Sequence, residues 1–266
     1  MKLFRWFAPA LAASALLCVG QTPAPATTPA PKPKAATPAA KPRPSPTGGA
    51  RPVARVNPKL RNPALANEKA PDFYKAKFTT TKGDFVVSVS RAAAPIGADR
   101  FYNMVKIGFF NDVYFFRMIP GFVAQFGIPS DPAIAAIWMN ARLKDEPVHE
   151  TNKRGSICFA KTNDPDTRTT QLFINLGDNN RLDAMGFAPF AVITEGMDVV
   201  DKLNLQYGDT PDQTLIQTKG AAYLTKEFPN LDKIISAVIT DPPPAPPRPK
   251  PAAPKPAAAK PPVKKT

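Results

Sequence analysis

The chain has 266 residues with one histidine and two cysteines, and its 35 Lys and Arg outnumber its 21 Asp and Glu, for a net charge of +14. So few histidines and cysteines exclude a metal site built on these residues. A net charge of this size suggests a nucleic-acid-binding protein, but residues 72–240 carry 18 Lys and Arg against 19 Asp and Glu. The positive excess therefore lies outside this segment, and no nucleic-acid partner is expected.

The first twenty residues, MKLFRWFAPALAASALLCVG, begin with basic residues and continue with a short apolar run that ends in small residues. This pattern predicts a secretory signal peptide over 1–20 and an exported protein of the periplasm or cell envelope. Cys18 offers an alternative, a lipid anchor, but Leu17 precedes it where lipoprotein signals favour a small residue. After processing, Cys158 would be the single cysteine, so no internal disulfide is expected.

Two stretches rich in proline and alanine flank the central segment. Residues 21–66 hold 12 of the 34 prolines and residues 241–266 hold 11. Such composition cannot bury enough apolar surface to offset the entropy of ordering the chain. We predict a disordered linker over 21–71 and a disordered tail over 241–266, whose basic runs are either solvated or loosely attracted to an anionic envelope surface.

The central segment, 72–240, is predicted to be one β-rich domain. Apolar alternation on both sides of Lys82-Gly83-Asp84 predicts a hairpin, and the next segment, 94–110, has the spacing of an amphipathic helix. Short strand-like runs follow, then a second helix over 195–208 and a last strand near 231–239. Two helices are too few for a parallel α/β fold. The pattern predicts a closed, mostly antiparallel β domain with two capping helices.

Few kinds of chemistry are open to this segment. His149 stands alone in polar sequence, and the acidic residues at 145–146 and 164–166 lie in loop-like sequence. Cys158 lies in a strand whose alternation would point it into the core or against the sheet's neighbours, so it is expected to be a small buried residue. No glycine-rich phosphate loop is present. What remains is a reaction that needs no nucleophile, metal or titrating group, such as rotation about a prolyl peptide bond.

Three blocks of sequence resemble the cyclophilins, which are peptidyl-prolyl cis-trans isomerases. They are FFRMIPGFVAQFG at 115–127, FAKTNDPDTRTTQLFIN at 159–175 and RLDAMGFAPFAVITEGMDVVDKL at 181–203. The resemblance runs from about 75 to 239 with the blocks in family order. It implies a closed eight-stranded antiparallel β-barrel with two capping helices, an active groove on the outer face, and no cofactor or metal.

The resemblance also implies a set of site residues. Arg117 and Gln125 match catalytic positions. The matching substrate-binding positions are Phe122, Val123, Ala160, Lys161, Gln171, Phe173, Leu182 and Phe187. Lys161 stands where the family usually has asparagine, and Arg181 stands where eukaryotic members have tryptophan. We expect both to be tolerated surface substitutions.

These features predict a monomeric isomerase that assists the folding of exported proteins by acting on their proline-containing segments. An alternative is a chaperone module that binds such segments without turnover. A third possibility is that the chain's own proline-rich tails occupy the groove.

Overall fold

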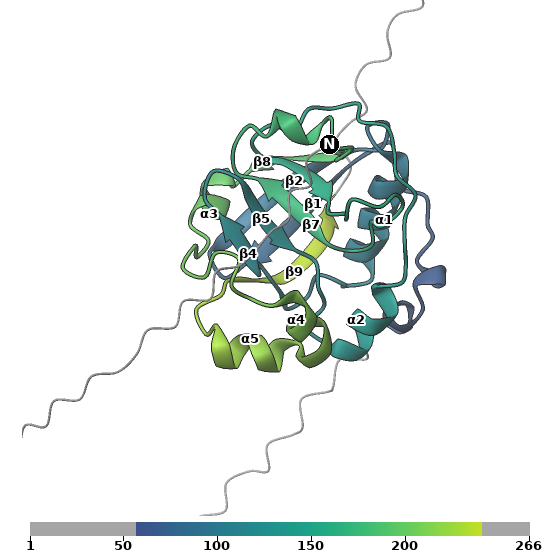
Figure 1. Ribbon diagram of the computed structural model, residues 1–266. Coiled ribbons are helices and arrows are strands. Elements are labelled where there is room, and N and C mark those ends of the chain that lie inside the picture. The colour runs from purple at the N-terminus through teal and green to yellow at the C-terminus, as the bar shows by residue number, and fades with distance from the viewer. Residues whose placement is uncertain (1–56, 241–266) are drawn as a thin grey trace, which may run out of the picture. The chain divides into compact units, whose positions relative to one another are not determined.

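The computed structural model of the chain describes residues 57–240. The predicted signal peptide, most of the predicted linker and the predicted tail after Thr240 lie outside the described residues. The described part is mainly β, as predicted (Figure 1).

One antiparallel sheet of nine strands dominates the described residues. The strands are β1 (Phe73–Thr80), β2 (Gly83–Ser90), β3 (Val113–Tyr114), β4 (Arg117–Ile119), β5 (Val123–Phe126), β6 (Ser156–Phe159), β7 (Leu172–Asn175), β8 (Ala191–Glu195) and β9 (Lys233–Thr240). Their order is β3-β9-β1-β2-β8-β6-β7-β5-β4. The predicted β1–β2 hairpin is confirmed, with Thr80 paired to Gly83.

The sheet curls because its two edge strands are neighbours in the chain. Only Phe115 and Phe116 separate β3, which pairs with β9, from β4, which pairs with β5. Both phenylalanines are 1% exposed; Phe115 packs into the main core, whereas Phe116 packs into a second cluster with Ile216 and Leu224. The strand is thus interrupted where its side chains enter two different cores. Counted as one interrupted strand, β3 and β4 give the predicted eight.

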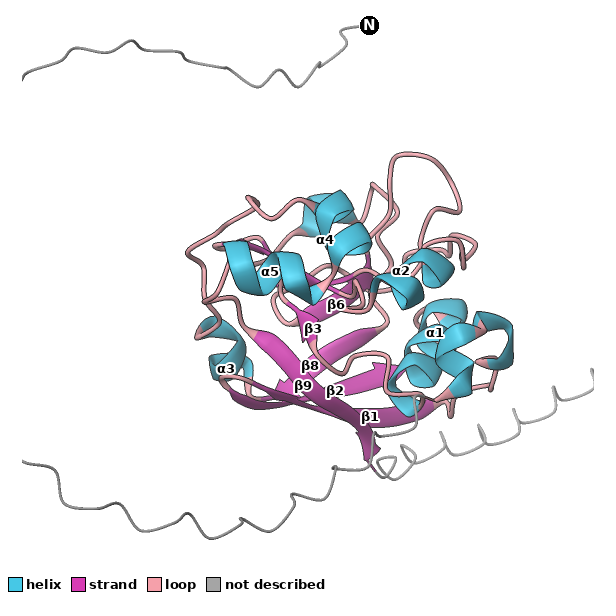
Figure 2. Ribbon diagram, turned by 90° about the horizontal axis from the view of Figure 1, so that it is seen from below, coloured by secondary structure: helices cyan, strands magenta, loops and turns pink. Residues whose placement is uncertain are grey.

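The prediction of two helices was wrong. The described residues contain α1 (Pro95–Lys106), α2 (Pro132–Trp138), α3 (Met197–Asp201), α4 (Gln213–Lys219) and α5 (Ala221–Glu227), with short 3-10 turns η1 (Pro58–Arg61), η2 (Pro63–Leu65) and η3 (Asn180–Leu182). No helix of this part is long and apolar enough to cross a membrane. In Figure 2, α2, α4 and α5 lie on one side of the strands, with α1 next to α2.

Helix α1 was predicted, but the second predicted helix is cut short. It ends at Asp201, and Asn204 forms a turn in which its side-chain oxygen accepts from the Gln206 amide while its own amide donates to Asp232. Helices α2 and α4 were not predicted, although each has an aspartate at its N-cap. The Asp131 and Asp212 side chains accept hydrogen bonds from backbone amides of the first turn, and Asp is a favoured N-cap residue.

The folded part begins earlier than the predicted boundary at Asp72. The Trp138 indole donates to the Leu60 carbonyl over 2.7 Å, and the Asn103 side chain bonds both the amide and the carbonyl of Glu68. Ala66 and Ala70 are buried. Residues 57–71 therefore pack on α1 and α2, because small side chains and bonded backbone groups compensate for the scarcity of large apolar residues.

Glu146 is buried, although it lies in sequence that was predicted to be polar loop. Its carboxylate accepts from the Arg168 guanidinium over 2.9 Å and from the amides of Ile96 and Gly97 at the start of α1. The side chains of Glu146 and Arg168 are 4% and 3% exposed. This carboxylate joins the loop before β6, the loop before β7 and α1, so its role is structural.

Replacing Gly127 with alanine is expected to destabilise the domain. Gly127 follows β5 with φ +102°, and an added Cβ would collide with the carbonyl oxygen of Thr170, whose hydroxyl in turn donates to the Gly127 carbonyl. A loss of about 2–4 kcal/mol in the free energy of unfolding is expected from urea titration. Gly121→Ala is the control, since Gly121 has φ +67° and open space around it. Equal losses for the two variants would contradict this interpretation.

Candidate active site

The strand register places one row of side chains on the outer face of the sheet. Arg117 on β4 lies opposite Gln125 on β5, Gln125 lies opposite Phe173 on β7, and Phe173 lies opposite Cys158 on β6. The next row, one residue along each strand, belongs to the main core: Met118, Ala124, Ile174 and Ile157. Strand alternation therefore explains how an arginine fits into an apolar run, because its neighbours point inward while it points outward.

A pocket of about 160 Å3 lies over this row. It is lined by Arg117, Phe122, Val123, Gln125, Ala160, Lys161, Phe173, Leu182 and Phe187. Every one of these residues was predicted for the site, and they come from three separate blocks of the sequence. The Phe173 and Phe187 rings meet edge to face with centroids 5.6 Å apart. The result is a small apolar recess with one guanidinium on its wall.

A chain of hydrogen bonds orients that guanidinium. Arg117 donates from Nη1 to the Gln125 side-chain oxygen over 3.4 Å, and Gln125 donates from Nε2 to the Gln171 side-chain oxygen over 2.8 Å. Arg117 has no carboxylate partner among the described residues. Most of its five N–H donors thus stay open to a ligand in the pocket.

A second cavity of about 230 Å3 adjoins the first, with which it shares Gln125, Ala160 and Lys161. Gln171, the remaining predicted residue, lines this second cavity. So do four residues that were not predicted: Thr162, Thr167, Thr169 and Gln213. The threonines lie inside a recognised block, whereas Gln213 opens α4, a helix that was missed.

Lys161 and Arg181, the two residues that differ from those usual in the family, have different surroundings. Lys161 was expected at the surface, but its side chain is only 11% exposed and it lines both cavities. Its ammonium lies 3.6 Å from the Asp145 carboxylate and 5.9 Å from the Phe187 ring centroid. That expectation was therefore wrong for Lys161. Arg181 is exposed, as expected, with its guanidinium 4.8 Å from the centroid of Phe122.

The other reactive residue types lie away from the pocket opening. Cys158 is fully buried beneath the pocket wall, and burial raises the pKa of its thiol well above the usual range. His149 is exposed on a loop. Both placements agree with the sequence prediction. Among residues 57–240, no three His, Cys, Asp or Glu side chains are grouped as a metal site would require.

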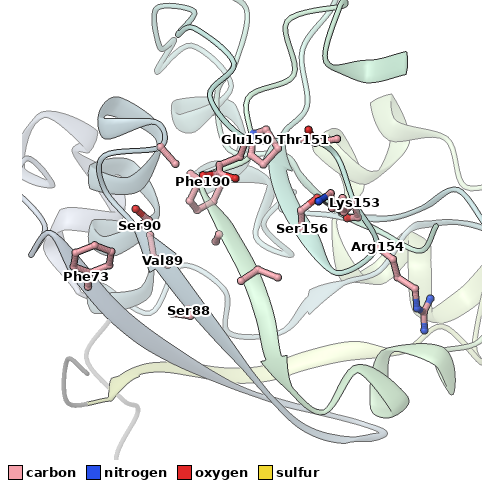
Figure 3. A pocket seen from close by; sticks show the side chains of 14 residues that line it. Phe73, Ser88, Val89, Ser90, Glu150, Thr151, Lys153, Arg154, Ser156 and Phe190 are labelled. Atoms are coloured by element: carbon pink, nitrogen blue, oxygen red, sulfur yellow. Dashed lines mark hydrogen bonds between the residues drawn. The ribbon is translucent and has the colours of Figure 1, made fainter. Parts of the chain in front are cut away.

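A larger cavity, of about 380 Å3, lies beside β2 and β8 (Figure 3). Its arginine, Arg154, extends away from Phe190 and Ser90 in this view. The Arg154 guanidinium is committed to the Asp201 carboxylate and to the Leu176 carbonyl. The guanidinium in this cavity is therefore not open to a ligand, whereas Arg117 has no carboxylate partner among the described residues, so the smaller pocket around Arg117 is the better candidate for chemistry.

Comparisons with known proteins show the family to which the chain belongs. The family model for cyclophilin-type peptidyl-prolyl cis-trans isomerases matches residues 75–220. A peptidyl-prolyl cis-trans isomerase of Acinetobacter baylyi is 37% identical over 47% of this chain and 68% of its own length. Peptidyl-prolyl cis-trans isomerase B of Escherichia coli is 34% identical over 47% of this chain and 81% of its own.

Among solved structures, a cyclophilin-type isomerase of Cryptosporidium parvum is similar with a TM-score of 0.48 and 18% identity, covering 64% of this chain and 99% of that one. The family model covers more than half of the chain, and the pocket residues lie inside the matched segment. The chain belongs to the cyclophilin-type peptidyl-prolyl cis-trans isomerases.

Proposed function

We propose that the pocket around Arg117 holds a proline ring and that Arg117 and Gln125 carry the catalysis. The observation that supports this most directly is an arginine that has no carboxylate partner among residues 57–240 and lies beside an apolar recess on the outer face of the sheet. The substrates are proline-containing segments of other proteins, and no metal or cofactor takes part.

The reaction is a rotation about the amide C–N bond that precedes proline, and no covalent bond is formed or broken. The barrier is about 18–20 kcal/mol because the amide C–N bond has partial double-bond character. When the amide twists, the prolyl nitrogen becomes pyramidal and gains a lone pair that is absent in the planar ground states. A catalyst must stabilise this twisted state in preference to the cis and trans forms.

Arg117 is placed to donate a hydrogen bond to that nitrogen. Its planar cation is already oriented by Gln125, so little reorganisation is needed as the lone pair develops. Phe122, Phe173 and Phe187 exclude water around the contact, which strengthens the interaction between the cation and the lone pair. Gln125 and Gln171 present further amide groups to the peptide backbone.

The test uses the full chain and short peptides that contain one Ala-Pro bond. Two-dimensional exchange NMR measures cis–trans interconversion directly and needs no coupling protease. Acceleration at catalytic protein concentrations supports the isomerase proposal. Peptide binding without acceleration, together with suppressed aggregation of an unfolded client, would support the binding module instead.

We further propose that the protein is exported and assists the folding of exported proteins. The support is the leader-like sequence at 1–20, which lies outside the described residues. Cell fractionation and the mass of the mature protein test this proposal. A mass that retains residues 1–20 would overturn it, and a lipid mass on Cys18 that is lost in Cys18→Ser would show anchoring.

Turnover is expected to be independent of pH between about 6 and 9. None of the described residues that line the pocket is His or Cys, the types whose charge ordinarily changes between about pH 6 and 9. The check is kcat/KM across this range at constant ionic strength. A bell-shaped profile would show that a titrating group takes part and would contradict the proposed mechanism.

A further inference from the structure

The two adjoining cavities are bordered by cations, and none of the described residues that line them is Asp or Glu. Arg117 and Lys161 line the first cavity, and Lys161 also lines the second. Arg181 lies at the rim over Phe122. Because residues 72–240 as a whole carry 18 Lys and Arg against 19 Asp and Glu, this is a local concentration of positive charge in a nearly neutral domain.

Arg117 and Arg181 approach the same aromatic ring. Their guanidinium carbons lie 5.9 and 4.8 Å from the Phe122 centroid, and neither has a carboxylate partner among residues 57–240. Two unpaired like charges around one ring repel each other, and an anion placed near them relieves that repulsion. The rim is therefore more favourable for a negative ligand than for a neutral one.

The charge of Lys161 is only partly compensated. Its partner Asp145 is shared, because one carboxylate oxygen lies 3.6 Å from Lys161 and the other lies 3.6 Å from Arg168. The second acidic residue of this loop, Glu146, is already bound by Arg168 and by the start of α1. Asp145 thus serves two cations, and Lys161 keeps a donor that is available to a substrate.

We propose that this groove selects prolines that have an aspartate or glutamate among the flanking residues. With the proline ring in the pocket, the flanking residues of an extended peptide pass Lys161 where the two cavities join and Arg181 at the rim. This inference names the substrate class of the site and rests on the proposed function. Basic clients would be disfavoured for the same electrostatic reason.

The expected preference is moderate because the pairs form at a partly solvated groove. Ion pairs of this kind change affinity by about two- to fivefold. Exchanging Glu for Lys at the same peptide position replaces an attraction with a repulsion, so the affinities of these two peptides should differ by about tenfold. The preference should fall as NaCl is raised from 0.05 to 1 M, because the screening length shrinks to about 3 Å.

The experiment compares peptides with one Ala-Pro bond in which Glu, Gln or Lys occupies one of the two positions before or after that dipeptide. Exchange NMR gives kcat/KM and chemical-shift titration gives affinity, each for the full chain and for Arg181→Gln and Lys161→Gln. At one flanking position or more, we expect kcat/KM and affinity to be higher for the Glu peptide than for the Gln peptide, and higher for the Gln peptide than for the Lys peptide. The Glu-to-Gln ratio should fall toward one in at least one variant. Lys202→Gln is the matched control, since Lys202 is exposed and paired with Asp198 on α3.

The outcomes separate this inference from the proposed function. If all peptides are isomerised with equal kcat/KM and bound with equal affinity, the acidic preference is overturned and the isomerase proposal stands. If no peptide is isomerised but the Glu peptides bind more tightly, the catalytic proposal fails and the acidic ligand class is supported. A Glu preference that survives in both groove variants, or that is lost equally in Lys202→Gln, would overturn the assignment to Lys161 and Arg181.

Discussion

Arg117→Ala is expected to lower kcat/KM for prolyl isomerisation by about 100-fold or more. The substitution removes the donor that meets the pyramidal nitrogen of the twisted amide, and removal of one such donor from an active site typically costs two to three orders of magnitude in rate. Arg117→Lys keeps the charge but loses the planar, multi-donor geometry, so a smaller but still large loss is expected. Exchange NMR on a single-proline peptide gives both values.

Arg117→Ala should lower the activity without lowering the stability of the fold. Arg117 lies on the outer face and has no carboxylate partner in the described residues, so the urea midpoint of Arg117→Ala should stay near that of the unchanged protein. Arg142→Ala is a matched control because Arg142 is exposed and lines neither cavity. Near-normal turnover by Arg117→Ala, with the fold intact, would show that another group stabilises the twisted amide.

Glu146→Gln is expected to destabilise the domain by about 3 kcal/mol or more. The change removes the closer charged partner of the Arg168 guanidinium, which is 3% exposed, and leaves it only the Asp145 carboxylate at 3.6 Å, which Lys161 shares. It also replaces an anion at the start of α1 with a neutral amide. Removing one member of a buried ion pair typically costs about 3–5 kcal/mol because the remaining charge is buried without compensation. Urea unfolding measures the loss.

Glu150→Gln makes the same chemical change at an exposed position nearby and should alter stability by less than about 0.5 kcal/mol. The double variant Glu146→Gln with Arg168→Met should recover part of the loss, since no charge is then left buried. Equal urea midpoints for Glu146→Gln and Glu150→Gln would show that the buried Glu146–Arg168 pair does not contribute to the stability of the domain.

Short helices and the N-terminal boundary were the least predictable parts of the fold. Helices α2, α4 and α5 each have seven residues, and helices of this length are not stable without tertiary packing. Their formation depends on contacts such as those of Phe116 with Ile216 and Leu224, which join residues distant in the sequence. The packing of residues 57–71 likewise depends on Trp138 and Asn103, which lie far along the chain.

The sequence by itself determined the β-rich class, the β1–β2 hairpin and α1, because alternation and glycine placement are local properties, and the family resemblance implied the residues that line the pocket. Three separated blocks held Arg117, Gln125 and the aromatic wall, and their resemblance to one family named the reaction. Only the tertiary structure decided that Arg117, Gln125 and Phe173 form one row, that Glu146 is buried against Arg168, and that Lys161 lies between two cavities. Strand register, burial and charge pairing join residues that are tens of positions apart, and no local pattern specifies them.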